Sequence, residues 1–286
     1  MRLPALAAAA VLLAASARAA RAQALQTLTS AREVRGEQAL TVHVAYAAGR
    51  FTLAPGAAGQ LYRMEVRYDA DKFAPLRDYD AAAGELRLGL KSLGHVSGSE
   101  QHRSGEVPTM DLALTPDVPL TLDVDLGAAE ASVELGGLEL RGLHYATGAS
   151  NSEVRFSRPN PVDCDSLAFD AGVARFDAAS LGNANCRHFR FDGGLGAVTL
   201  DFSGAWRQDA DAFFHVAAGT LTLRLPRGLG VAITLDRFLA SFDASGFTKR
   251  GDVYYSDGYT TAAHHLTIEV ESALGGIEVV WVGASD

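Results

Sequence analysis

One short pattern recurs along most of this chain: an apolar residue followed five positions later by glycine. In its main run the pattern begins at Leu122, Leu143, Leu167, Phe189 and Phe214, so successive copies start 21, 24, 22 and 25 residues apart. Apolar and polar residues alternate with period two on both sides of each glycine, as they do in a β-strand with one buried face. Each copy therefore predicts a strand, a bend and a second strand.

Two further copies lie outside this run. The first begins at Val44 and reaches Gly49, and the last begins at Leu266, where Glu271 takes the glycine position. A unit of this length cannot bury its own apolar face, but stacked copies build a continuous core. The sequence therefore predicts an all-β fold, a repeat-built parallel β-solenoid. The alternative is an up-and-down barrel or a sandwich, neither of which explains a repeat in constant register.

The two cysteines of the chain fall at the same place in consecutive copies. Cys164 lies three residues before Leu167, and Cys186 lies three before Phe189. Equivalent residues in neighbouring strands of a parallel stack are about 4.8 Å apart, a separation that a disulfide can span. We therefore expect a Cys164–Cys186 disulfide and an oxidising compartment, with two buried thiols as the alternative.

The first residues have the layout of a secretory signal peptide. Arg2 precedes an apolar run from Leu6 to Ala15, which is too short to span a membrane, and small residues follow. We expect cleavage after Ala24, with an uncleaved anchor as the alternative. The predicted segments are a signal peptide over 1–24, a small N-terminal β lobe over 25–115 and the solenoid domain over 116–286. The mature chain is expected in the periplasm, at the cell surface or outside the cell.

Charge and hydropathy narrow the range of partners. The net charge of −9 at pH 7 argues against nucleic acid, since an acidic surface repels a phosphate backbone. After the signal peptide there is no run of about 18 apolar residues, so no transmembrane span is expected. The exposed edges of the terminal strands would allow a homodimer.

From about Leu120 to Trp281 the chain resembles the toastrack domains of bacterial LiaF-like cell-envelope proteins and adhesins. The resemblance is carried by "LDVDLGAAEASVELGGLELRGLHYATGAS", by the repeated Phe-Asp-x-Gly turns and by "GYTTAAHHLTIEVESALGGIEVVW". The segment that starts "LTVHVAYAAGRFTL" resembles the domain that precedes the toastrack in many of these proteins.

The resemblance implies an exported, non-catalytic envelope protein whose solenoid is a structural or adhesive surface for protein or glycan. It supplies no catalytic residue and no cofactor. LiaF-like proteins carry transmembrane helices ahead of the domain, whereas this chain has the predicted signal peptide there. A role in sensing envelope stress would therefore need a membrane-bound signalling partner.

Three aspartates, Asp125, Asp170 and Asp192, occupy one position of the repeat, two residues before the glycine. Stacked carboxylates repel one another unless they are solvated, hydrogen-bonded or bridged by a cation. One interpretation is that they cap the glycine turns by accepting hydrogen bonds from backbone N–H groups. The alternatives are a Ca²⁺ ion held by Asp170 and Asp192 and a polysaccharide-active enzyme that uses the same pair.

The candidate binding residues are Tyr254, Tyr255 and Tyr259. They interrupt the repeat, within the 52-residue gap between Phe214 and Leu266. Clustered tyrosines offer a large amphipathic contact area and are common in surfaces that bind sugars and proteins. The alternative is that they clamp the end of the solenoid over its core.

Two other features are interpreted as structural. His264 and His265 are adjacent, and neighbouring side chains of a strand face opposite ways, so we expect surface or turn residues rather than joint metal ligands. The stretch "GGLGAV" over Gly193–Val198 looks like a nucleotide-binding loop. It has no helix after it, and its glycines already belong to the turns of the repeat.

Overall fold

The computed structural model describes residues 25–93 and 107–283, so the predicted signal peptide over 1–24 lies outside the described residues. Within these ranges the regular elements are fifteen strands, all in one sheet, and two short 3-10 turns. No helix in the described ranges is long and apolar enough to cross a membrane. The predicted all-β class is confirmed.

The strands fall into two groups by length. Eight have 13 to 18 residues: β2 (Leu40–Pro55), β7 (Leu120–Glu134), β8 (Leu140–Arg155), β9 (Cys164–Ala179), β10 (Cys186–Asp201), β11 (Ala210–Pro226), β12 (Gly230–Phe242) and β15 (His265–Val282). The rest have 4 to 9: β1 (Gln26–Glu33), β3 (Gln60–Tyr68), β4 (Phe73–Asp80), β5 (Glu85–Ser92), β6 (Thr109–Leu114), β13 (Phe247–Arg250) and β14 (Val253–Ser256). The turns are η1 (Leu181–Ala184) and η2 (Tyr259–Thr261).

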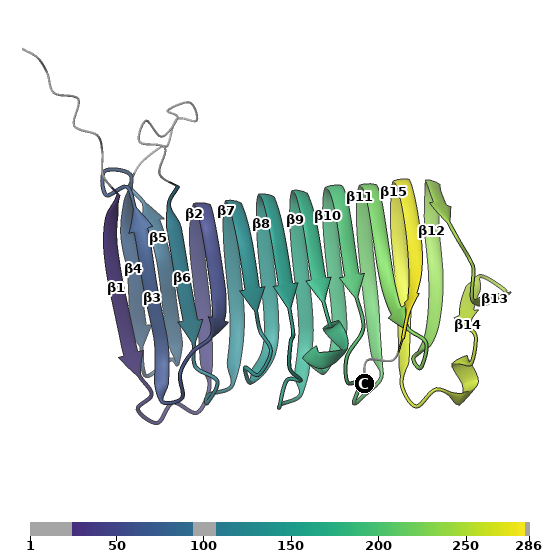
Figure 1. Ribbon diagram of the computed structural model, residues 1–286, viewed down its shortest axis with the longest axis horizontal. Helices are drawn as coiled ribbons and strands as arrows, with labels where there is room; N and C mark the ends of the chain where they lie inside the picture. The colour runs from purple at the N-terminus through teal and green to yellow at the C-terminus, as the bar shows by residue number, and fades with distance from the viewer. Residues whose placement is uncertain (1–24, 94–106, 284–286) are drawn as a thin grey trace, which may run out of the picture.

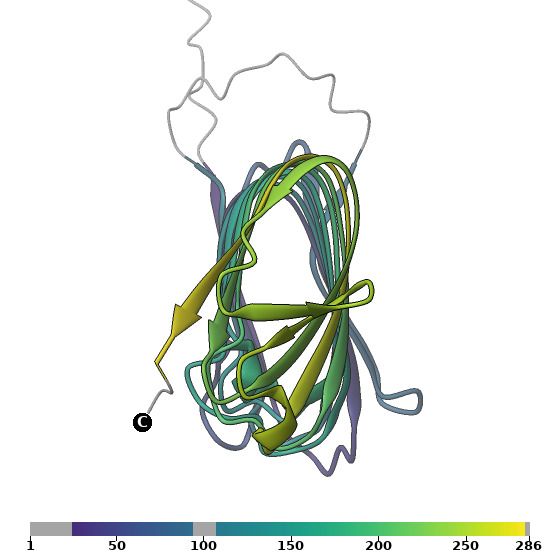
Figure 2. The ribbon, with the colours of Figure 1, turned by 90° about the vertical axis from the view of Figure 1, so that its right-hand side faces the viewer.

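Each long strand bends near its middle, so that it has a first leg, a bend and a second leg (Figure 2). The long strands stack in parallel like slices in a rack, in the order β2, β7, β8, β9, β10, β11, β15 and β12 (Figure 1). The last strand in the chain, β15, therefore lies between β11 and β12. Both legs of β12 pair with β15, which places β12 at the end of the stack.

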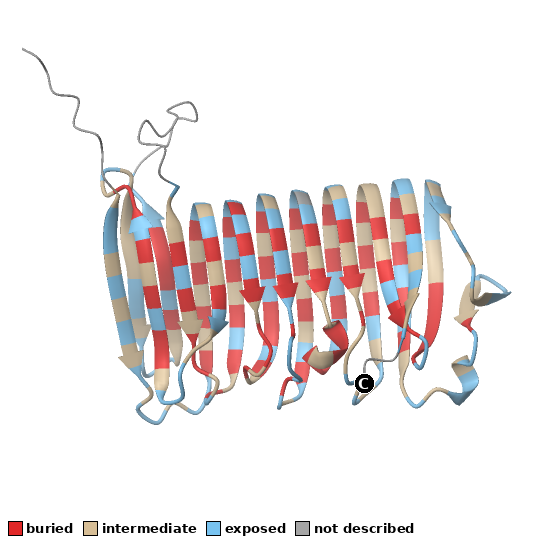
Figure 3. Cartoon of the chain, in the orientation of Figure 1, coloured by how far each residue is buried: buried red, intermediate tan, exposed pale blue. Residues whose placement is uncertain are grey.

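The core lies between the two legs. Alternate residues of each strand point inward and are buried, while those between them face solvent (Figure 3). Leu122, Leu143, Leu167 and Phe189 are neighbours in consecutive first legs, and each is at most 4% exposed. Burying one such side chain contributes about 1.5 to 3 kcal/mol. The apolar face that one copy cannot bury is thus covered by its own second leg and by its neighbours.

The predicted register is confirmed for four copies and is wrong for three. Val42, rather than Val44, lies beside Leu122. Phe214 lies beside Phe191 rather than beside Phe189. In the last copy, Leu266 lies beside Ala210 rather than Phe214.

The errors at Val44 and Phe214 arise because the bends use two columns of glycine, two residues apart, whereas the error at Leu266 is a separate shift of four residues. In β7 to β10 the column is Gly127, Gly148, Gly172 and Gly194. From β10 onward it lies two residues later, at Gly196, Gly219 and Gly275. The stretch "GGLG" of β10 belongs to both columns. In the last copy, the glycine that lies beside Gly219 is Gly275, and Glu271 lies beside His215 instead.

The glycine columns exist because successive bends pack too closely for a side chain. A Cβ added at Gly172 would lie 2.8 Å from the carbonyl oxygen of Gly148, and one at Gly194 would lie 2.6 Å from that of Gly172. At Gly219 the backbone also has a φ of 134°, a conformation that side chains rarely adopt.

At the N-terminal end the rack is built from separate short strands. β5 pairs with the first leg of β2, and β6 pairs with its second leg. β4 and β3 then add to these strands in antiparallel orientation, and β1 pairs with β3. Hydrogen bonding is continuous from β2 to β7 across the predicted boundary at 115/116, so the division into two domains stays a prediction.

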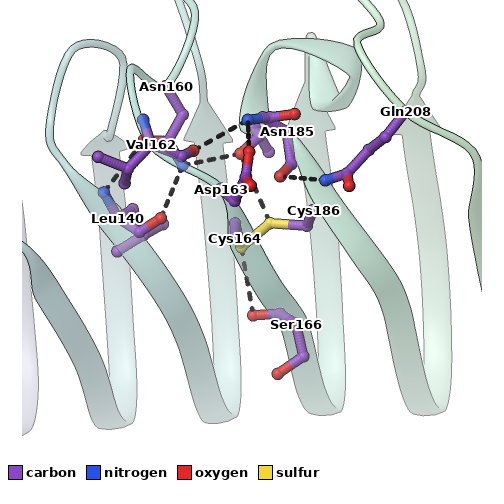
Figure 4. Close-up of a disulfide and its surroundings, with 10 residues drawn as sticks. Leu140, Asn160, Val162, Asp163, Cys164, Ser166, Asn185, Cys186 and Gln208 are labelled. Carbon is purple, nitrogen blue, oxygen red and sulfur yellow. Dashed lines mark hydrogen bonds between the residues drawn. A yellow bond between two sulfur atoms is a disulfide. The ribbon is translucent and has the colours of Figure 1, made fainter.

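The predicted disulfide is present. Cys164 and Cys186 begin β9 and β10, are register partners and have Cα atoms 4.2 Å apart (Figure 4). Amide side chains join the loops beside it. The buried Asn160 donates hydrogen bonds to the carbonyl oxygens of Leu140 and Ala184, at 2.6 and 2.9 Å. The base of the rack is therefore tied covalently and by hydrogen bonds across neighbouring strands.

Replacing Gly219 by alanine should lower the free energy of unfolding by about 2 to 4 kcal/mol, because the new Cβ meets the Gly196 carbonyl and the positive φ is strained. Gly228→Ala is the matched control, since a Cβ there meets nothing within 4 Å, and should change stability by less than about 0.5 kcal/mol. Urea denaturation measures both. Equal stability of the two variants would contradict the packing argument.

Removing the disulfide in a Cys164→Ala/Cys186→Ala variant should lower the free energy of unfolding by about 3 kcal/mol, because the 22-residue separation leaves a loop of that size unconstrained in the unfolded chain. Urea denaturation with and without dithiothreitol checks this. The reductant should destabilise the wild type and leave the variant unchanged. A wild type indifferent to reductant would show that the bond does not form.

Candidate functional site

The outer face of the first legs carries a line of ionisable side chains. Its members point outward from β2, β7, β8, β9, β10 and β11, and we call them the histidine–aspartate row: His43, Asp123, His144, Asp170, Arg190, Asp192 and His215. Parallel pairing places them at two adjacent outward positions of the strands. His43, Asp123, His144 and Arg190 share the first position. Asp170, Asp192 and His215 share the second, two residues later, so His144 lies diagonally from Asp170. The row crosses six strands of the rack.

His144 is held between two carboxylates. Its Nδ1 lies 3.0 Å from Asp123 Oδ1, and its Nε2 lies 2.9 Å from Asp170 Oδ2. A neutral imidazole has one donor nitrogen and one acceptor nitrogen, whereas a carboxylate only accepts. Both contacts can be hydrogen bonds only when both ring nitrogens carry a proton. This geometry therefore selects the imidazolium form of His144.

The pKa values shift accordingly. Hydrogen bonds to Asp170 and Asp123 raise the pKa of His144 above its usual 6.5. Burial alone would raise the pKa of Asp123, but hydrogen bonds from His144 and His43 outweigh it and bring that pKa below 3.8. The Nδ1 atom of His43 lies 3.0 Å from Asp123 Oδ2. Asp123 is thus an anion shared by two histidines on neighbouring strands.

A second cluster lies on β10 and β11. His215 Nδ1 is 3.0 Å from Asp192 Oδ1, and Arg190 donates to Asp192 Oδ2 at 3.2 Å. The hydrogen bond with His215 lowers the pKa of Asp192, and Arg190 adds to the effect. Beside the row, His188 Nδ1 lies 2.8 Å from Asp211 Oδ1.

Asp170 and Asp192 are register partners, as the repeat predicts. Their side-chain hydrogen bonds go to histidine and arginine rather than to backbone N–H groups, so the expectation that they cap the glycine turns is wrong. With Asp125 they line an open depression whose floor is formed by small residues: Ala146, Ala171, Gly172 and Gly194. The depression exists because the strands carry small residues between the carboxylates.

No group of three or more His, Cys, Asp and Glu side chains in the described ranges is arranged to hold a metal ion. Asp170 and Asp192 each already accept a hydrogen bond from a histidine. The calcium alternative at this pair stays a prediction.

The three candidate tyrosines lie together at the C-terminal end of the rack. The ring of Tyr254 packs against Phe242 at 5.1 Å between centroids, and Tyr255 packs against Tyr259 at 4.9 Å. All three side chains are partly buried. The first contact joins β14 to β12 and the second joins β14 to η2, which is compatible with the clamp interpretation. A binding role for the tyrosines stays a prediction.

The two adjacent histidines also serve the end of the rack. The ring of His265 packs edge to face against Tyr259, with centroids 4.8 Å apart, and its Nε2 lies 3.0 Å from the Tyr259 carbonyl oxygen. His264 Nδ1 is 3.9 Å from Asp209 Oδ1. His265 Nδ1 lies 3.7 Å from the same Asp209 oxygen, and the His265 backbone N–H donates to it at 2.8 Å, so both histidines approach one carboxylate.

The histidine–aspartate row was not predicted from the sequence. Part of the signal was accessible, because Asp123 follows Leu122 and His144 follows Leu143, and these leucines were correctly aligned. His43 and His215 were each placed two residues out of register, beside the wrong neighbours. Predicting the row requires the correct register of β2 and β11, which the second glycine column defines.

His144→Gln should reduce stability in a pH-dependent way. Because the folded pKa of His144 is raised, its contribution is fully present below about pH 6.5 and is lost as the pH rises through the folded pKa. Since the pairs are half exposed, we expect a loss of about 0.5 to 1 kcal/mol near pH 5.5, falling towards zero near pH 9. Urea denaturation at both pH values measures it.

The matched control for this variant is His188→Gln, because His188 contacts a single carboxylate, Asp211. It should cost less than His144→Gln at pH 5.5. The paired-imidazolium interpretation is wrong if the two variants have the same stability profile, or if the effect of His144→Gln grows with pH.

Comparison with known proteins identifies a matching family and solved structures with a similar fold. Residues 21–178, more than half of the chain, match the family described as the N-terminal domain of toast_rack, DUF2154. The search of curated proteins returned no match. A putative cell adhesion protein from Clostridium sporogenes has a similar structure, with a TM-score of 0.50 and 15% identity over 90% of this chain and 100% of its own. A putative adhesin from Bacteroides fragilis aligns with a TM-score of 0.30 and 10% identity, over 89% of this chain and 97% of its own.

The matched segment contains the N-terminal short strands and the first copies of the rack, through most of β9. It therefore covers the N-terminal region of resemblance and the first part of the Leu120–Trp281 region. The chain belongs to the toast-rack family.

Proposed function

We propose that this protein is an exported, non-catalytic cell-envelope protein whose rack is an adhesive surface for glycan or protein. The observation that carries the proposal is the histidine–aspartate row, a band of ionisable groups that crosses six strands spaced about 4.8 Å apart. A periodic ligand, such as a polysaccharide, can meet several of these groups at once.

The depression beside the row fits this use. It is open and is lined by the carboxylates of Asp125, Asp170 and Asp192 over a floor of small residues. Carboxylate and imidazole groups accept and donate hydrogen bonds at the hydroxyl and amide groups of glycans and at the polar groups of proteins. Because the strands already hold these side chains in place, little conformational entropy is lost on binding.

The geometry favours binding over cleavage. Most glycoside hydrolases place two carboxyl groups on opposite sides of the bond that they break. Asp170 and Asp192 instead project from the same face of one sheet, on adjacent strands. His144 holds the first, while His215 and Arg190 hold the second. Both carboxylates are thus engaged by cationic or hydrogen-bonding side chains on the surface of the sheet, which suits a binding surface.

Two observations support export. The Cys164–Cys186 disulfide is of a kind that persists in oxidising compartments. The first 24 residues have the pattern of a signal peptide. The solved structure with this fold from C. sporogenes carries the description of a putative cell adhesion protein, in keeping with a surface role.

The test is binding of the mature chain to immobilised envelope polysaccharides and to an envelope protein extract. An Asp125→Asn/Asp170→Asn/Asp192→Asn variant should bind at least tenfold more weakly, because it loses three charged acceptors. The control is Glu153→Gln/Asp177→Asn, which removes two carboxylates from the outer face of the second legs. Circular dichroism confirms that both variants are folded.

The same experiment decides between adhesion and enzymatic activity. If the wild type releases new reducing ends or unsaturated sugars from a polysaccharide and the triple variant does not, the enzyme alternative is correct. If the triple variant and its control bind equally well, the row is not the adhesive surface.

A further inference from the structure

The bends of the long strands carry a line of exposed apolar side chains. One residue per strand points outward at the bend, and we call this line, with the adjacent Phe238, the apolar crest: Ala48, Ala128, Ala149, Val173, Leu195, Ala218, Leu274 and Leu239. From Ala149 to Leu239 each crest residue is the register partner of the next. The crest is separate from the histidine–aspartate row on the first legs.

The large side chains of the crest gather at its C-terminal half. Val173, Leu195, Leu274, Leu239 and Phe238 are between 49% and 82% exposed. They span the strands β9, β10, β11, β15 and β12, four intervals of about 4.8 Å and so about 19 Å. Isolated exposed apolar residues are ordinary, but a contiguous line of them marks a surface that contacts another apolar phase.

The crest is uncharged across its width. In β10, β11 and β15 the residues on both sides of the crest residue are glycine or alanine. Leu195 lies between Gly194 and Gly196, and Leu274 lies between Ala273 and Gly275. The glycines are required by the close packing of the bends, but nothing in that packing requires leucine at a position that faces solvent.

The shape of the crest restricts what can cover it. The bends lie along a nearly straight edge at the top of Figure 1, and the end view in Figure 2 shows that this edge is narrow and convex. A strip of about 19 Å by three residues, or about 10 Å, offers about 200 Å². A stable protein interface needs about 800 Å² from each partner, so a second copy of the crest would bury too little.

A lipid bilayer does not need a contact area of about 800 Å² on the protein. A planar surface can touch every residue of a straight ridge at once, and each side chain that enters it leaves water. The charge of the chain selects the kind of surface. The net charge of −9 opposes approach to anionic lipid, and Asp170, Asp192 and Asp236 lie on the adjoining first legs. Two cations, Arg175 and Arg237, lie nearer the crest, each two residues from a crest side chain.

We propose that the apolar crest is a membrane-contact surface, which seats the rack with its bends on a zwitterionic lipid bilayer. This proposal does not depend on the adhesive function of the histidine–aspartate row. Seated in this way, the protein would keep both outer faces of the rack in water, standing upright from the lipid surface.

Flotation of the mature chain with phosphatidylcholine vesicles tests the proposal. The wild type should float with the vesicles, and Leu195→Asn/Leu239→Asn/Leu274→Asn should lower the partition coefficient at least tenfold. Val280→Asn is the matched control, because Val280 is 42% exposed on the second leg of β15, away from the crest. It should bind as the wild type does.

A variant that binds vesicles more tightly provides a second test, because misfolding of the triple variant cannot explain increased binding. Ala218 is the small residue between Leu195 and Leu274 in the line, so Ala218→Leu should raise the partition coefficient severalfold. Replacing a third of the lipid with phosphatidylglycerol should weaken binding of the wild type, and added salt should restore it.

Three results would overturn the proposal. The first is a wild type that floats with neither kind of vesicle. The second is a triple variant that binds as the wild type does. The third is a wild-type dimer in light scattering that the triple variant abolishes, which would assign the crest to a second copy. Polysaccharide binding by the crest variants should be unchanged, so failure of this proposal and failure of the adhesive function are distinguishable.

Discussion

The close contact between successive bends is the constraint on which the rest of the structure depends. At each bend the carbonyl oxygen of one strand occupies the space where a side chain of the next would be, as between Gly148 and Gly172 and between Gly219 and Gly275. This contact holds neighbouring strands in one register over both legs. A fixed register turns every position of the strand into a column, so the core, the disulfide, the histidine–aspartate row and the apolar crest follow from the same contact.

Much of this architecture could be predicted from the residues. Alternation on both sides of glycine gave the bent strands, and the spacing of Cys164 and Cys186 gave the disulfide. A shift of two residues could not be seen, because it leaves the alternation of period two unchanged and only the glycine contact reveals it. The shift in β10 therefore misplaced Phe214 and, with it, the neighbours of His215. Leu266 was misplaced by four residues, because Glu271 rather than Gly275 was aligned with Gly219.

Other features were hidden for different reasons. The place of β12 at the end of the stack depends on which strand pairs with β15, and no local pattern encodes that choice. The amide side chain of Asn160 bonds to backbone groups of Leu140 and Ala184, twenty or more residues away along the chain. His144 became a candidate only when its two ring nitrogens were found beside carboxylates from two different strands. Sites of this kind are made by the stack rather than by a motif.

The place of β15 between β11 and β12 has a consequence for how the chain folds. β2 and β7 to β11 can add to the rack one after another as they emerge, because each new long strand pairs with one already in place. β12 cannot, since its only long partner is β15, which is synthesised last. The end of the molecule thus forms in a single late step, in which β15 pairs with β11 on one side and with β12 on the other. This step has a high contact order. Until then, a partly synthesised chain would hold an ordered stack with an unfinished end.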